Sequence, residues 1–259
     1  MTLNVLSLFS GIGGLELGLE RAGMTTVGQV ELDLFCRSVL ERHFPEVPRH
    51  DDVRTAPAWW RSQSRPRVDV LAGGFPCQPF SSAGLRRGIG DPRWGWPWMR
   101  DALDAVRPRY VLIENVAALL GYVEAFAIVL DDLSRRGFAV EWSVVPACAL
   151  GAPHPRRRLF VLAYPDGVDG PAGLGVGDRR TVLARHRSQG PWRDPVDGFM
   201  AARTRTDRVA DGVPAELDGP RITALGNAVV PAVTERIGRL ILAHYASYAG
   251  HAPLLQTAA

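Results

Sequence analysis

Short apolar runs alternate with amphipathic helical patterns along the first two thirds of this chain, and that alternation restricts the folds available to it. The apolar runs are expected strands at residues 4–8, 26–30, 68–72, 110–113, 138–145 and 159–163. Helical periodicity lies between several of them, at residues 15–22, 33–43 and 123–133. We therefore predict an α/β fold with a mostly parallel, doubly wound (Rossmann-like) sheet covered on both faces.

The regular pattern breaks at about residue 165. Residues 166–220 are rich in Gly, Pro, Asp and Arg and show little periodicity, which is typical of a loop-rich insertion. Regular signals return at Ile222, and Pro231 suits the first turn of a helix with Val233 and Ile237 on its apolar face. We predict three parts: residues 1–165, a small insertion at 166–220, and a C-terminal return at 221–259.

Composition narrows the functional classes. The 259 residues suffice for a sizeable core, and the formal net charge of +3 is compatible with a nucleic acid partner without establishing one. Cys36, Cys77 and Cys148 are an odd number without CxxC spacing, so we expect neither a disulfide framework nor a metal site. With no signal peptide and no run long enough to span a bilayer, the expectation is a cytoplasmic protein that does not associate with membranes.

Cys77 stands on a tight Gly- and Pro-framed loop, residues 73–81, directly after the expected strand at 68–72. Open α/β folds build their sites at the carboxyl ends of strands. A thiolate there is suited to attack a carbon conjugated to a carbonyl. A lone free cysteine is as often a small buried hydrophobe, so Cys77 alone leaves both interpretations open.

Two acidic residues accompany a glycine loop near the N-terminus. The loop, residues 9–14, joins a strand to a helix and lets the backbone approach a ligand closely. Glu31 ends the second strand, where a carboxylate can accept hydrogen bonds from ribose hydroxyls or simply precede a helix. Asp52 lies beyond the next helix and is either an adenine contact or a turn residue.

Glu114 follows the strand at 110–113 and is expected to face the same crevice as Cys77, although such a glutamate also suits the start of a helix. Arg156 and Arg158 alternate onto one face if their run is extended, which would aim two guanidiniums at one site. A solvated basic turn is the alternative.

Taken in order, these segments resemble the cytosine-C5 DNA methyltransferases, which use S-adenosylmethionine. The glycine loop resembles their first cofactor motif, Phe-Pro-Cys-Gln-Pro-Phe-Ser at 75–81 their nucleophile motif, and Glu-Asn-Val at 114–116 their glutamate motif. The segment at 154–158 is similar to their Gln-x-Arg-x-Arg motif, with His154 in place of glutamine. Residues 224–231 resemble the last motif, which returns to complete the cofactor pocket. The resemblance covers nearly the whole chain except 166–220.

The resemblance implies a Rossmann-like methyltransferase sheet with a target-recognition region at 166–220. It implies methyl transfer to C5 of a cytosine flipped out of double-stranded DNA, through a covalent bond between Cys77 and C6. The implied catalytic residues are Cys77, Glu114, Arg156 and Arg158. The implied cofactor contacts are Phe9, Gly11, Gly13, Glu31, Leu32, Asp52, Val53, Pro76, Asn227 and Val229. The implied nucleic acid contacts are Gln78, Ser81, Arg86, Arg87 and Arg93, and no metal is implied.

Two further predictions concern DNA. The loop from Ser82 to Trp98, with its arginines and with Trp94 and Trp96, is expected to be a mobile lid. The insertion is expected to read the target sequence, with these candidate contacts: Arg179, Arg180, Arg185, Arg187, Trp192 and Arg193. The segment at 208–214 stands where the family has an arginine-bearing motif that this chain lacks.

Two alternatives stay open. A branch of the same family acts on tRNA with the same catalytic parts, and a DNA-binding relative that has lost catalysis belongs to another functional class. We expect a monomer because one polypeptide holds the whole site. A cognate restriction endonuclease that acts separately is also compatible with the resemblance.

Overall fold

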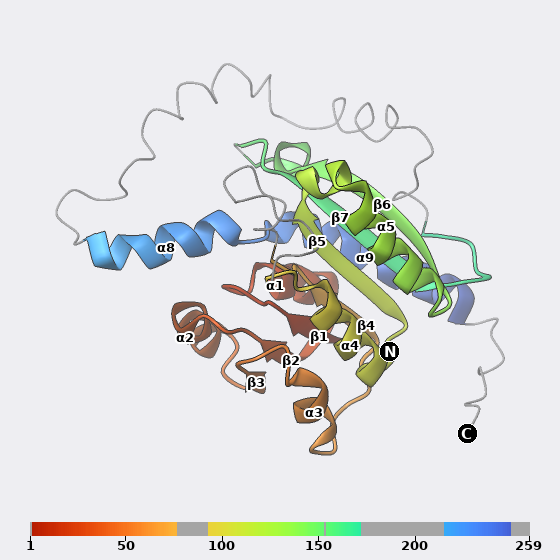
Figure 1. Cartoon of the computed structure of the whole chain (residues 1–259), viewed down its shortest axis with the longest axis horizontal. Helices are drawn as coiled ribbons and strands as arrows, with labels where there is room; N and C mark the ends of the chain where they lie inside the picture. The colour runs from red at the N-terminus through yellow and green to blue at the C-terminus, as the bar shows by residue number, and fades with distance from the viewer. Residues whose placement is uncertain (1, 77–92, 153, 172–214, 250–259) are drawn as a thin grey trace.

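The computed structural model describes residues 2–76, 93–152, 154–171 and 215–249. Within these ranges a seven-stranded sheet has the order β3-β2-β1-β4-β5-β7-β6 (Figure 1). The strands are β1 (Asn4–Leu8), β2 (Thr25–Val30), β3 (Arg49–His50), β4 (Val70–Gly73), β5 (Tyr110–Val116), β6 (Phe138–Pro146) and β7 (Arg157–Pro165). Strand β7 runs antiparallel to both β5 and β6, and the other recorded pairings are parallel. The predicted mostly parallel α/β sheet is confirmed.

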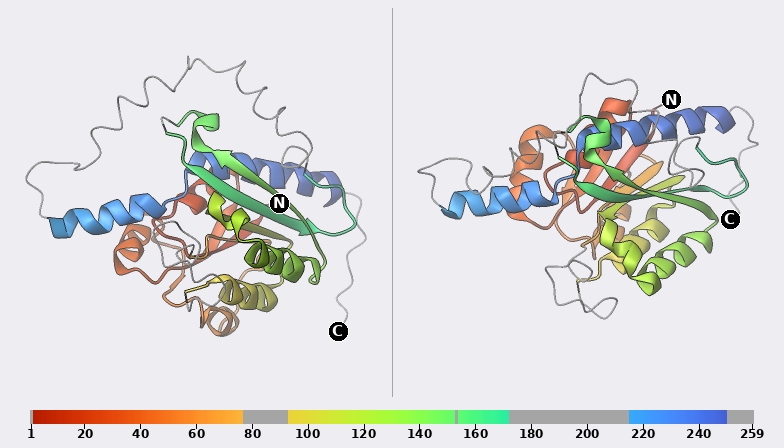
Figure 2. Two further views of the ribbon diagram at one scale, coloured as in Figure 1. Left: turned by 45° about the horizontal axis from the view of Figure 1, so that its top comes forward. Right: turned by 90° about the horizontal axis from the view of Figure 1, so that it is seen from above.

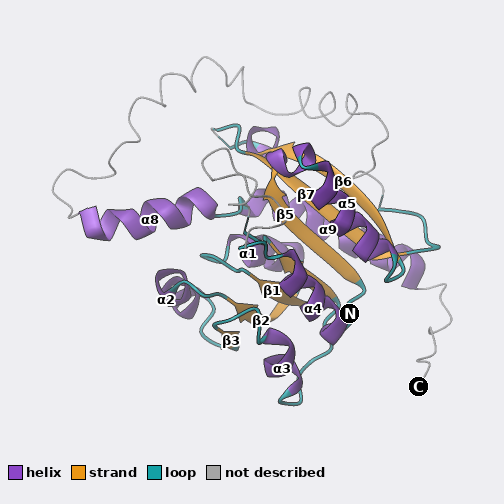
Figure 3. Ribbon diagram, in the orientation of Figure 1, coloured by secondary structure: helices purple, strands orange, loops and turns teal. Residues whose placement is uncertain are grey.

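Helices cover both faces of this sheet, as Figures 2 and 3 show. Helices α1 (Gly14–Ala22) and α9 (Pro231–Ala249) pack on one face and share a buried core with Val5, Val70 and Leu112. Helices α3 (Ala56–Arg61), α4 (Trp96–Val106) and α5 (Val123–Ser134) cover the other face. Side chains alternate between the two faces along each strand, so continuous apolar runs supply both cores.

Helix α1 crosses the start of α9 at very short range. A Cβ atom at Gly14 would overlap the Val229 carbonyl, and one at Gly18 would overlap both Thr234 Oγ1 and the Pro231 carbonyl. Glycine is therefore required at both positions for the backbones to approach this closely. The contact seats the C-terminal segment directly beside the glycine loop that precedes α1.

Two more helices flank the carboxyl ends of the strands. Helix α2 (Leu34–His43) is preceded by Asp33, whose side chain accepts a hydrogen bond from the Cys36 N–H at 2.8 Å and so caps the helix. Helix α8 (Ala215–Asn227) extends away from the sheet in Figure 1 and runs across the expected boundary between residues 220 and 221. None of the helices in the described ranges is both long and apolar enough to cross a bilayer.

Candidate active site

A cleft of about 1040 Å³ opens at the carboxyl ends of the central strands. Its walls come from the segments that follow β1, β2, β3, β4 and β5, together with the C-terminal half of α8. This is where open α/β sheets bind their ligands. Of the expected cofactor contacts, these line the cleft: Phe9, Gly11, Glu31, Leu32, Asp52, Val53, Pro76, Asn227 and Val229.

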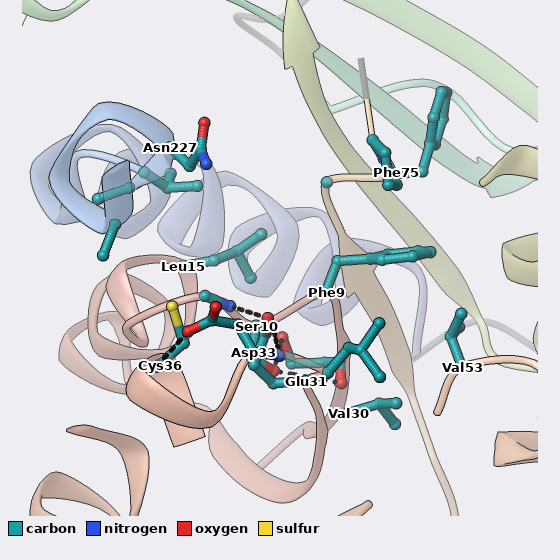
Figure 4. Close-up of a pocket in the computed structure, with 18 of the residues that line it drawn as sticks. Phe9, Ser10, Leu15, Val30, Glu31, Asp33, Cys36, Val53, Phe75 and Asn227 are labelled. Atoms are coloured by element: carbon teal, nitrogen blue, oxygen red, sulfur yellow. Dashed lines mark hydrogen bonds between the residues drawn. The ribbon is translucent and has the colours of Figure 1, made fainter. Parts of the chain in front are cut away.

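The glycine loop is held in shape by Glu31 (Figure 4). The Gly11 N–H donates to Glu31 Oε2 at 2.6 Å, and the Asp33 N–H donates to Oε1 at 2.8 Å. Phe9 has a φ of 55°, which a residue with a side chain adopts only at a cost, and such strain collects at binding sites. A Cβ at Gly11 would meet nothing within 4 Å, so open space lies over the loop.

Gly13 plays a different part from Gly11. It has a φ of 86°, and a Cβ there would lie 2.6 Å from the Phe44 ring. Gly13 therefore lets α2 pack beneath the loop.

Asp52 lies at the cleft wall, but its carboxylate is engaged. Arg54 Nη2 lies 2.6 Å from Asp52 Oδ2, and Arg54 Nε also donates to this carboxylate. These hydrogen bonds hold the pKa of Asp52 below its usual range, so the group stays charged. The adenine and turn interpretations of Asp52 are both compatible with this position.

Glu114 is buried at the end of β5 and faces the same cleft. Arg158 Nε lies 3.1 Å from Glu114 Oε1, yet no well-aligned hydrogen bond reaches that oxygen. Burial raises the pKa of Glu114 to about 7, although Arg158 and Arg156 act in the opposite direction. The site thus holds a carboxyl group that can exchange a proton near neutral pH.

The loop that follows β4 is fastened to the end of β5. Asn115 Nδ2 donates to the Phe75 carbonyl at 3.1 Å, and a Cβ at Gly74 would lie 2.9 Å from Glu114 Oε2. Phe75 and Pro76 therefore have a fixed position beside Glu114. Sequence reasoning missed the role of Asn115, since no local pattern marks a contact across 40 positions.

The two arginines of the predicted basic pair bind different partners. Arg158 pairs with Glu114, whereas Arg156 donates to the carbonyls of Leu225 at 3.2 Å and Gly226 at 2.6 Å. Both side chains are partly buried, so the solvated-turn alternative does not describe them. The structure brings Arg158, but not Arg156, into direct contact with the carboxylate.

Several expected site residues lie outside the described ranges. They are Cys77, Gln78, Ser81, Arg86 and Arg87, and the same holds for the six candidates in the insertion between Arg179 and Arg193. Arg93 is described and exposed just before α4.

The prediction that the mobile lid extends to Trp98 is wrong for its last residues. Trp94 and Trp96 are buried in the core, and Trp96 Nε1 donates to Asp132 Oδ2 at 2.9 Å. Trp96 also begins α4, with Pro97 in its first turn. This segment is an anchor, because moving it would expose two indole rings.

The cleft also contains residues that the sequence did not single out. Leu34 lines it, as does Thr223 of α8. Leu34 is 77% exposed and is the first residue of α2. Its only sequence signal is its place in the helical pattern at residues 33–43.

Fold and cleft together define an α/β protein with a cleft at the carboxyl edge of its sheet. Residues 3–171 match the family model described as C-5 cytosine-specific DNA methylase, and the chain belongs to that family. It is 36% identical to the Type II methyltransferase M2.BsuMI of Bacillus subtilis, over 62% of this chain and 42% of that protein. It is also 36% identical to M.NgoBI of Neisseria gonorrhoeae, over 63% of this chain and 51% of that protein.

Solved structures agree on the fold. A Spodoptera frugiperda DNMT2 mutant superposes with a TM-score of 0.54 at 24% identity, covering 66% of this chain and 52% of that one. The chain therefore spans about half the length of the relatives it matches.

Proposed function

We propose that this protein is a DNA (cytosine-5)-methyltransferase that uses S-adenosylmethionine and acts on double-stranded DNA as a cytoplasmic monomer. The observation that carries this proposal is the shared cleft. Buried Glu114 and its partner Arg158 lie in the same cavity as the glycine loop and Glu31, and Pro76, the neighbour of Cys77, lines it too. A base site and a cofactor site must adjoin for direct group transfer between them.

The residues present fit S-adenosylmethionine. The space over Gly11 is open, the Glu31 carboxylate lies beside it, and Phe9, Leu32 and Val53 offer apolar surface for a purine. Ribose hydroxyls would need Glu31 to accept hydrogen bonds in addition to those from the backbone. When bound, this cofactor supplies an electrophilic methyl group on a sulfonium.

The chain's own residues would make cytosine reactive. The Cys77 thiolate forms a bond to C6, which removes the ring conjugation and gives C5 nucleophilic, enamine-like character. A protonated Glu114 donates to N3, where negative charge develops, and its pKa of about 7 keeps this form available. Arg158 orients the carboxyl group and the base edge.

The cycle closes with water as the base. Once C5 carries the methyl group, water takes the C5 proton, the electrons of that C–H bond re-form the C5–C6 double bond, and the C6–S bond breaks to release the Cys77 thiolate. N3 then returns its proton to Glu114. Inside a duplex, C6 is inaccessible, so the base must be rotated out of the stack at a cost of a few kcal/mol.

Transfer of labelled methyl groups tests the proposal directly. Purified protein is incubated with labelled S-adenosylmethionine and either duplex DNA or tRNA, with Cys77→Ser as the control. We expect label in DNA cytosine and none with the variant. Label in tRNA alone would support the RNA alternative, and no label in either with folded protein would favour the non-catalytic one.

A further inference from the structure

The last turn of α8 is held by a side chain from the segment just before β7. Arg156 donates from Nη1 to the Leu225 carbonyl and from Nη2 to the Gly226 carbonyl. The final carbonyls of a helix have no partners within the helix and form the negative end of its dipole. A forked guanidinium can satisfy two of them at once, and here it does so next to Asn227, the last residue of α8.

This turn is part of the cleft wall. Thr223, Ala224, Asn227 and Val229 all line the cavity. On the far side of the turn, the Val229 carbonyl lies so close to Gly14 that no side chain fits between them. The segment 225–229 is therefore fixed at one end by Arg156 and at the other by α1.

The backbone at Arg156 is itself held by hydrogen bonds. The carbonyls of Pro155 and Arg156 both accept from the Ala147 N–H, at 2.9 and 3.4 Å, and β7 begins at the next residue. The guanidinium is half-buried, which lowers the pKa of Arg156 because the charge loses hydration. Its hydrogen bonds to the two carbonyls offset that loss and stabilise the side chain in this position.

We propose that Arg156 is a positioning residue for the cofactor half of the cleft: it holds the last turn of α8, and with it Asn227 and Val229, against the glycine loop. Arg158 serves the half that contains Glu114. Each arginine therefore supports a different half of the cleft. This inference rests on the proposed function, because it takes S-adenosylmethionine as the ligand of that half.

The test compares three neighbouring arginines in the full chain. Arg156→Met, Arg158→Met and the control Arg157→Met, whose side chain is exposed, are titrated with S-adenosylhomocysteine by calorimetry. Losing hydrogen bonds from a charged donor predicts a roughly 10- to 100-fold weaker affinity for Arg156→Met. Arg157→Met and Arg158→Met should bind it within about threefold of the wild-type protein.

Kinetics add a readout that a general loss of structure would not produce. Arg156→Met should raise KM for S-adenosylmethionine while kcat at saturation changes little, whereas Arg158→Met should lose kcat. An unchanged affinity with a lost kcat in Arg156→Met would overturn the proposal and place Arg156 at the base. An equal loss of affinity in Arg156→Met and Arg158→Met would overturn the division between them.

Arg156→Lys covers the case in which Arg156→Met does not fold. A lysine keeps the charge but cannot span both carbonyls, so it should weaken S-adenosylhomocysteine binding by an intermediate factor. Wild-type affinity in Arg156→Lys would refute the role of the paired contact. If the wild-type protein itself binds no S-adenosylhomocysteine, the proposed function fails and this inference fails with it.

Discussion

Arg158 Nε approaches Glu114 Oε1 to 3.1 Å across the β5–β7 pair, with both side chains largely removed from solvent. Despite this cation, burial keeps the pKa of Glu114 at about 7, above the ordinary glutamate value of 4.5. Desolvation of the carboxylate thus outweighs its attraction to the guanidinium.

The raised pKa predicts a pH-dependent stability. Between pH 4.5 and about 7 the folded protein holds the Glu114 proton and the unfolded chain does not, so the free energy of unfolding falls as pH rises through this window. The loss from this group amounts to about 3 kcal/mol at most. Glu114→Gln cannot ionise and should lack this loss, which urea denaturation at pH 5 and pH 8 measures. If the free energy of unfolding changed equally in the two proteins between these pH values, Glu114 would not have a raised pKa.

The hydrogen bond from Asn115 to the Phe75 carbonyl predicts that Asn115→Ala loses methyl-transfer activity while its stability falls only slightly. Asn115→Ala removes a buried hydrogen bond worth about 1 kcal/mol and leaves the carbonyl without its donor. We expect methyl transfer to fall at least tenfold, because the loop that carries Cys77 loses its anchor. Labelled-methyl transfer and thermal unfolding measure the two effects. Full activity in a variant of normal stability would show that the anchor is unnecessary.

The α1–α9 crossing predicts that Gly18→Ala is destabilising, although alanine usually favours a helix. Its methyl group would overlap the Pro231 carbonyl and Thr234 Oγ1, and we expect a cost of about 1–3 kcal/mol. Gly121→Ala is the matched control, since a Cβ there meets nothing within 4 Å and the residue is exposed. Chemical denaturation should separate the two, and equal stabilities would mean that the helices can move apart freely.

The hydrogen bonds of Glu31 predict that its substitution weakens cofactor binding without weakening DNA binding. Glu31→Ala removes the acceptor for the Gly11 and Asp33 N–H groups, so the glycine loop loses its brace. The affinity of Glu31→Ala for S-adenosylhomocysteine should fall by roughly 10-fold or more. Glu31→Gln keeps one acceptor, so its affinity should fall less. Duplex DNA binding should stay near the wild-type value. If calorimetry found the wild-type cofactor affinity in Glu31→Ala, Glu31 would have no part in cofactor binding.

Much of the sheet could be predicted because buried strands leave a continuous apolar signature. Strand β3 could not, since Arg49 and His50 form no apolar run. Helix α4 carried a readable signal, with Trp96, Met99 and Leu103 at helical spacing, but its tryptophans suggested a surface lid instead. Its burial follows from packing against Phe75 rather than from anything local.

The residue types of the site could be predicted, but not its partners. Cleft-lining positions such as Glu31 and Glu114 follow from strand ends in an open sheet. The attachment of Arg156 to Gly226 joins positions 70 apart, and only the three-dimensional fold brings them together. An extended run with alternating arginines suggested a shared target, whereas the paired carbonyls of α8 attract one of the two.

Base-resolution sequencing of 5-methylcytosine in a methylation-free host determines whether this chain methylates DNA cytosine through Cys77. The host expresses this chain or Cys77→Ser, with soluble protein verified in both cases. We expect cytosine methylation confined to one short sequence context and present only with Cys77. Unmethylated DNA in the presence of soluble wild-type protein, or equal methylation with Cys77→Ser, would contradict it.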